Sequence, residues 1–170
     1  MLSLDDTIAA IATPLGSGGV GIVKLSGPEA KAIALRLFRP MRGEPALTPR
    51  ALRYGQIVYP ETGLPLDEAL LAYMPAPHSY TRQDVVEIQS HGGTVVLQEI
   101  LQAVFSLGAR PAEAGEMTMR AFVNGRLDLA QAEAVLDVVE AKTAAGLRLA
   151  TQQLGGALSG VRPGDETERE

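Results

Sequence analysis

Three polar side chains alternate along a predicted strand near the middle of the chain. Glu87, Gln89 and His91 lie two residues apart, with the apolar Val86 and Ile88 in the same run. Successive side chains of a strand point to opposite faces, so the apolar pair predicts a core face and the polar trio an opposite, chemical face. The carboxylate could accept two parallel hydrogen bonds from an amidine-like edge, such as that of a pterin or purine. The pattern alone leaves open whether this face binds a ligand or is only solvated.

A second candidate motif is rich in glycine. Gly16, Gly18 and Gly21 match the G-x-G-x-x-G spacing of dinucleotide-binding sites. That motif must open a helix, whereas residues 22–26 alternate like a strand, and no acidic residue stands in the expected place about 20 positions downstream. We therefore expect a glycine-rich hairpin or a loop that a ligand approaches, and no nicotinamide dinucleotide.

Other catalytic signatures are weak. His91-Gly92-Gly93 is similar to the oxyanion loop of some esterases, but the sequence contains no G-x-S-x-G elbow. Glu87, His78 and His91 are too widely spaced to make a convincing metal site, so we assign no metal and no catalytic residue. The sequence also contains no G-x-x-x-x-G-K-[S/T] loop, the P-loop that binds nucleoside triphosphates.

Composition narrows the class of protein. The 170 residues are 46% hydrophobic, carry a net charge of -5 and include no cysteine. This predicts one globular domain plus a smaller fragment, without disulfides or thiolate metal ligands. Without a basic tract, the chain alone is expected to bind nucleic acid poorly. We expect neither a signal peptide nor a membrane span, and therefore a cytoplasmic protein.

The elements that must position these residues follow irregularly along the chain. Lys24 is a strand cation behind the glycine-rich loop, and Asp128 and Gln131 form a predicted capping box at the start of one helix or two. Strands are predicted over residues 7–12, 22–26, 52–59, 68–74 and 84–93, and helices over residues 28–39, 94–107 and 128–158. This order favours an α+β fold with a mixed sheet over a doubly wound one. The polar residues 161–170 predict a disordered tail.

Many spaced motifs carry a family resemblance. They are Asp6-Thr7-Ile8-Ala9-Ala10-Ile11-Ala12-Thr13-Pro14, Gly18-Gly19-Val20-Gly21-Ile22, Ser79-Tyr80-Thr81, Asp84-Val85-Val86-Glu87, His91-Gly92-Gly93, Gly115-Glu116, Arg120-Ala121-Phe122, and the run from Asn124-Gly125-Arg126 through Leu127-Asp128-Leu129-Ala130-Gln131-Ala132-Glu133-Ala134. In this order, over nearly all of residues 6–160, the sequence resembles the amino-terminal part of the MnmE family, also called TrmE, of tRNA modification GTPases.

The resemblance implies a tetrahydrofolate-binding, homodimerising domain over residues 1–118, similar to the folate-binding domain of glycine-cleavage T-protein. The start of a helical domain would follow over residues 119–160. Residue by residue, the family's folate contacts fall on Lys24, Glu87 and Arg126. The family often has Arg at the first and Lys at the last, so charge is kept, although Lys24 loses bidentate geometry. The ligand would be a 5-formyl or 5,10-methylene derivative, with its anionic glutamyl tail on Lys24 or Arg126 and its pterin on Glu87.

The resemblance also implies a wider function. Full-length members act with the FAD-dependent partner MnmG on the wobble uridine of certain tRNAs, and use GTP, magnesium and potassium in a G domain. We expect that G domain to be missing here, so this chain should not hydrolyse GTP by itself. The alternative is a dimerisation scaffold or truncated paralogue whose folate site is unused.

Overall fold

The computed structural model describes residues 4–156. The chain divides into two compact units, residues 1–117 and 118–170. The predicted tail over residues 161–170 lies outside the described residues.

The first unit is built on a seven-stranded sheet. Its strands are β1 (Ile8–Ile11), β2 (Gly18–Ser26), β3 (Phe38–Pro40), β4 (Leu52–Val58), β5 (Pro65–Met74), β6 (Val85–Gly92) and β7 (Arg110–Pro111). Their order is β3-β4-β5-β6-β2-β1-β7, and β1 pairs in parallel with β7, whereas the other neighbours are antiparallel. The predicted α+β class with a mixed sheet is thus confirmed.

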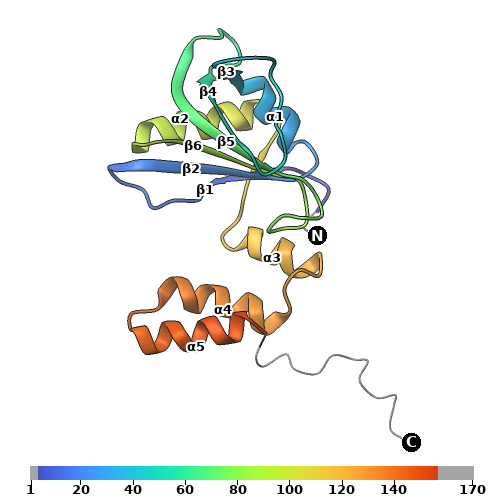
Figure 1. Ribbon diagram of the computed structural model, residues 1–170, viewed down its shortest axis with the longest axis vertical. Coiled ribbons are helices and arrows are strands. Elements are labelled where there is room, and N and C mark those ends of the chain that lie inside the picture. Colours follow the sequence, from blue (N-terminus) through green and yellow to red (C-terminus); the bar gives the residue numbers. More distant parts are fainter. Residues whose placement is uncertain (1–3, 157–170) are drawn as a thin grey trace, which may run out of the picture. The chain divides into compact units, whose positions relative to one another are not determined.

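Two helices, α1 (Ala30–Leu37) and α2 (Thr94–Ser106), lie beside this sheet (Figure 1). They share a core cluster with Val23 of β2 and with Val86 and Ile88 of β6, all three of which are fully buried. The alternation predicted for β6 is therefore confirmed. We call the sheet face opposite α1 and α2 the open face.

The glycine-rich segment belongs to a hairpin, one of the two predicted alternatives, because β1 and β2 pair antiparallel on either side of residues 12–17. The strand begins earlier than predicted: β2 starts at Gly18, and its pairing with β6 shifts register between Gly18 and Gly21. A Cβ on Gly92 would lie only 2.5 Å from the Gly18 carbonyl oxygen, so glycine lets the two backbones approach closely. No helix follows these glycines before Ala30, and the dinucleotide-binding context is absent from this part of the described chain.

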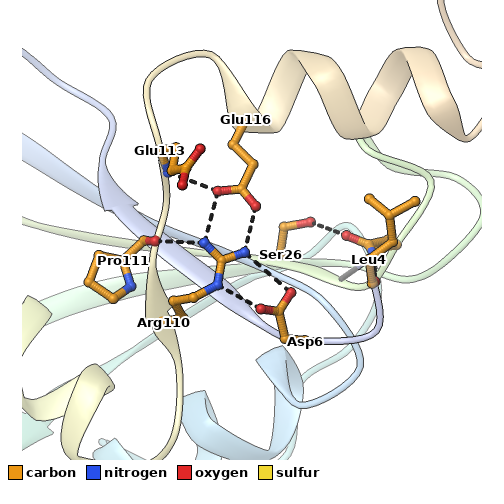
Figure 2. Close-up of polar contacts among 8 residues, drawn as sticks. Leu4, Asp6, Ser26, Arg110, Pro111, Glu113 and Glu116 are labelled. Carbon is orange, nitrogen blue, oxygen red and sulfur yellow. Dashed lines mark hydrogen bonds and ion pairs between the residues drawn. The ribbon is translucent and has the colours of Figure 1, made fainter. Parts of the chain in front are cut away.

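An ion-pair cluster joins the amino-terminal segment to β7 and the next helix (Figure 2). Arg110 Nε donates to Asp6 Oδ2 at 2.6 Å, and its Nη2 donates to Glu116 Oε1 at 2.6 Å. The Glu116 side chain is 1% exposed and also accepts the Glu113 backbone N–H at 2.8 Å. These two carboxylates raise the pKa of Arg110, chiefly through the hydrogen bonds of Glu116 and then of Asp6. One guanidinium thus joins segments that are 104 residues apart.

The helices α3 (Glu116–Val123), α4 (Leu129–Glu140) and α5 (Ala144–Leu154) complete the described chain, and the division between units falls inside α3. The capping box is confirmed, since Asp128 Oδ1 accepts from Gln131 N at 2.8 Å and Gln131 Oε1 accepts from Asp128 N at 3.0 Å. Thr143 caps α5 in turn, so this segment forms two helices. No helix within residues 4–156 is long and apolar enough to cross a membrane.

Candidate functional site

The structure brings together two of the three predicted site residues. The register of β2 and β6 places Lys24 directly opposite Glu87. Lys24 Nζ lies 3.3 Å from Glu87 Oε1, and the two side chains are 25% and 22% exposed. Their strand neighbours on either side are core residues, so alternation holds both charged groups on the open face. Each residue could be predicted as a site residue from its own strand. That the two residues pair is known only from the register of β2 and β6 in the sheet.

An aromatic ring adjoins this pair. Lys24 Nζ lies 5.7 Å from the centroid of the Tyr80 ring, within the range of a cation–π contact. Carboxylate, ammonium and ring therefore form a contiguous row contributed by β6, β2 and the loop between β5 and β6. The sequence analysis assigned Tyr80 no role. Its only signal was its place in the motif Ser79-Tyr80-Thr81.

The row fits a ligand that is both planar and anionic. Glu87 can accept paired hydrogen bonds from a heterocycle edge, Lys24 can hold a carboxylate, and an aromatic ring can cover an apolar face. The Lys24–Glu87 pair is partly open to water, and such pairs contribute only about 0 to 1 kcal/mol. Exchanging this pair for contacts with a ligand would therefore cost the protein little.

The third predicted residue, Arg126, belongs to the second unit. It is exposed and lies in the turn that follows α3, where its backbone N–H donates to the Ala121 carbonyl at 2.8 Å. Gly125 supports this turn with a φ of 72°, a conformation that glycine adopts without strain. The fold thus presents the Arg126 side chain from a tight helix-ending turn.

His91 was considered above for an oxyanion loop and for a metal site, but in the structure it contacts Asp67. Its Nδ1 lies 2.8 Å from Asp67 Oδ1, and its backbone N–H donates to Asp67 Oδ2 at 2.9 Å. The imidazole is 70% exposed, and its pKa is raised, mainly by the hydrogen bond to Asp67. His91 also borders a cavity of about 240 Å³ that is lined by Gly19, Val20, Tyr54, Glu68, Ala69, Leu70, Gln89 and Ser90. Within residues 4–156, no group of three or more acidic, histidine or cysteine side chains could hold a metal ion.

We expect His91 to titrate above the ordinary histidine pKa of about 6.5, because Asp67 stabilises the imidazolium. Since the folded-state pKa is raised, the stabilisation is full below pH of about 6.5 and is lost as pH rises through the folded-state pKa. Asp67→Asn should move the pKa back down. A 1H–13C NMR titration of the imidazole measures this, with His78, the other histidine, as internal control. An unchanged His91 titration in the variant would contradict the assignment.

The sequence is similar to one family of known proteins. A family described as "GTP-binding protein TrmE N-terminus" matches residues 7–126. A "tRNA modification GTPase MnmE" of Chloroflexus aurantiacus is 57% identical over 156 residues, which are 92% of this chain and 34% of that protein. Its namesakes in Koribacter versatilis and Moorella thermoacetica are 49% and 54% identical over 158 residues each, or 35% and 34% of those proteins. The chain thus spans about a third of the length of these relatives.

Proposed function

The chain belongs to the MnmE (TrmE) family of tRNA modification GTPases, and we propose that its first unit binds a tetrahydrofolate derivative on the open face. One observation carries this proposal: Lys24 and Glu87 are cross-strand partners, 3.3 Å apart, with an aromatic ring beside them. A folate combines a pterin with an amidine-like edge and an anionic glutamyl tail. Glu87 offers acceptors for that edge, the ring offers a face for the pterin, and Lys24 brings a positive charge to a site for an anionic ligand.

The proposed roles follow from charge. Glu87 accepts hydrogen bonds from the pterin edge, and Lys24 is the cation beside it in the first unit. The family resemblance also assigns Arg126 to the ligand. A bound 5-formyl or 5,10-methylene derivative supplies one carbon. The residues of this chain hold and orient the ligand, and we assign none of them to a bond-making step.

Titration calorimetry with 5-formyltetrahydrofolate tests the proposal. We expect heat with one saturable site per chain and a rise in thermal midpoint, because a ligand that binds only the native state stabilises it. The alternative is a scaffold or truncated paralogue with an unused site. That alternative predicts no heat and equal thermal midpoints with and without folate, from protein that is folded.

We also propose that the first unit forms a homodimer through the open face. In support, Leu52 and Tyr54 of β4 and Val20 of β2 are 59%, 46% and 63% exposed, although all three side chains are apolar or aromatic. Gathered exposed apolar residues are typical of protein interaction surfaces. The cavity that Val20 and Tyr54 line belongs to the same surface.

Leu52→Glu should convert the dimer to a monomer, because an unpaired carboxylate is costly to bury in an interface. Light scattering after size exclusion measures the mass in solution. Leu64→Glu is the matched control, since Leu64 is 62% exposed but lies in the turn between β4 and β5. A Leu52→Glu protein that stays as dimeric as the control would exclude this part of the face from the interface.

The wider activity is proposed for the full-length protein. Acting with the FAD-dependent partner MnmG, it would modify the wobble uridine of tRNA in the cytoplasm, where its tRNA substrates are. GTP, magnesium and potassium belong to the family's G domain, and this sequence contains no P-loop. The contribution proposed for the present residues is the folate site and the dimer contact.

A further inference from the structure

The loop between β5 and β6, residues 75–84, is tied firmly to the end of β2. The Thr81 hydroxyl lies 2.7 Å from the hydroxyl of Ser26, and both residues are fully buried. Ser26 also donates to Gln83 Oε1 at 3.0 Å, and Gln83 Nε2 donates to the Leu4 carbonyl at 2.8 Å. A buried hydrogen bond supported by two part-buried ones holds a segment in one arrangement. These bonds therefore hold the loop, and the side chains on it, in a fixed position.

What the loop carries toward the candidate site is Tyr80. It precedes the anchored Thr81 in the chain, and Ser26 and Lys24 lie two residues apart on one face of β2. The anchor therefore sets the place of the ring beside Lys24, where Nζ lies 5.7 Å from the ring centroid. Tyr80 itself is half-buried.

We propose that Tyr80 is a further folate-binding residue, whose ring stacks on the pterin that Glu87 holds by its edge. The proposal rests on the folate-binding function proposed above. A heterocycle that is bound only through its edge has both ring faces exposed to water. Stacking on an aromatic side chain buries one of these faces. Binding requires the Lys24 ammonium to leave the face of the ring that the pterin would cover. That movement is inexpensive, because the contacts of Lys24 are partly exposed.

The other tyrosines do not offer the same arrangement. The Tyr73 ring is buried in the core cluster, and the Tyr59 hydroxyl donates to Glu99 on α2 at 3.0 Å. Tyr54 lies on β4, two strands away from β6 in the sheet order. The chain contains four tyrosines and no tryptophan, so the aromatic signals of the rings are few.

Calorimetry with 5-formyltetrahydrofolate on the whole chain tests the proposal. Tyr80→Leu should weaken binding by about tenfold or more, as expected for loss of a stacked aromatic, whereas Tyr80→Phe should stay within about threefold of the unchanged protein. Tyr59→Leu is the matched control and should also stay within about threefold. A merely structural role for Tyr80 would lower the thermal midpoint of ligand-free Tyr80→Leu without this split between Leu and Phe.

The outcomes separate the two proposals. If the unchanged protein binds no folate, the proposed function is wrong and this inference is wrong with it. If the unchanged protein and Tyr80→Leu bind alike, only the role of Tyr80 is overturned. Should Tyr80→Leu not fold, NMR of the unchanged protein decides. The Tyr80 ring signals, identified by their absence from Tyr80→Phe, should shift on saturation while those of Tyr59 stay in place, and an unshifted Tyr80 ring would overturn the inference.

Discussion

Glu87→Gln is expected to weaken binding of 5-formyltetrahydrofolate by roughly 10-fold to 150-fold. A hydrogen bond to a charged group contributes about 1.5 to 3 kcal/mol, and each 1.4 kcal/mol is about tenfold in affinity. The amide keeps the shape of the carboxylate but presents an N–H group to the donors of the pterin edge. Titration calorimetry on folded protein gives the dissociation constant directly.

The control for this variant must change charge without touching the site. Glu61→Gln does so, because Glu61 is an exposed residue of the turn between β4 and β5. Gln83, although close in sequence, is unsuitable, since its side chain anchors the loop that carries Tyr80. Equal affinities for Glu87→Gln and Glu61→Gln would remove Glu87 from the site. The stability of Glu87→Gln should change by no more than about 1 kcal/mol, since the ion pair with Lys24 is partly exposed.

Glu116→Ala should lower the free energy of unfolding by about 2 to 3 kcal/mol. Its buried carboxylate binds the Arg110 guanidinium through both oxygens, at 2.6 and 3.2 Å, and accepts the Glu113 N–H. Breaking a fully buried ion pair costs about 3 to 5 kcal/mol. The loss expected here is at or below the lower end of that range, because the Arg110 side chain is 34% exposed and retains Asp6. Urea unfolding followed by circular dichroism measures the loss.

Glu113→Ala is the matched control for Glu116→Ala. Glu113 is exposed, and only its backbone takes part in the cluster, so the variant should stay within about 0.5 kcal/mol of the unchanged protein. The slope of the unfolding curve should be similar for both variants, which would show that the same surface is exposed on unfolding. Coinciding midpoints for the two variants would mean that the cluster contributes no stability.

Elements with a strong local pattern were predictable from the sequence. The alternation of β6, the helical spacing of α2 and the Asp128–Gln131 capping box each arise within a few consecutive residues. The sequence analysis missed helix α3 and the strands β3 and β7. The two strands have little local signal. The strands β3 and β7 are three and two residues long, and each exists only through pairing with a strand elsewhere. The glycines of β2 favour a loop locally, but the ladder with β6 extends the strand to Gly18.

Two charged candidates, Lys24 and Glu87, were identified from strand alternation and family resemblance, because the residue type and the face of a strand are local properties. Their partnership is not local. It depends on the register between β2 and β6, and a slip of one residue would send each side chain to the opposite face. The same holds for Tyr80, whose place beside Lys24 depends on a buried bond between Thr81 and Ser26.

The sequence by itself therefore determined the family, the class of fold and the charged residues available for a ligand. Only the tertiary structure decided that one lysine, one glutamate and one tyrosine adjoin, that Asp67 holds His91, and that Arg110 joins Asp6 to Glu116. The physical reason is the range of the interactions. Propensity, capping and alternation act between near neighbours in the chain, whereas these contacts form only when burial of the core aligns strands and loops that are distant in sequence.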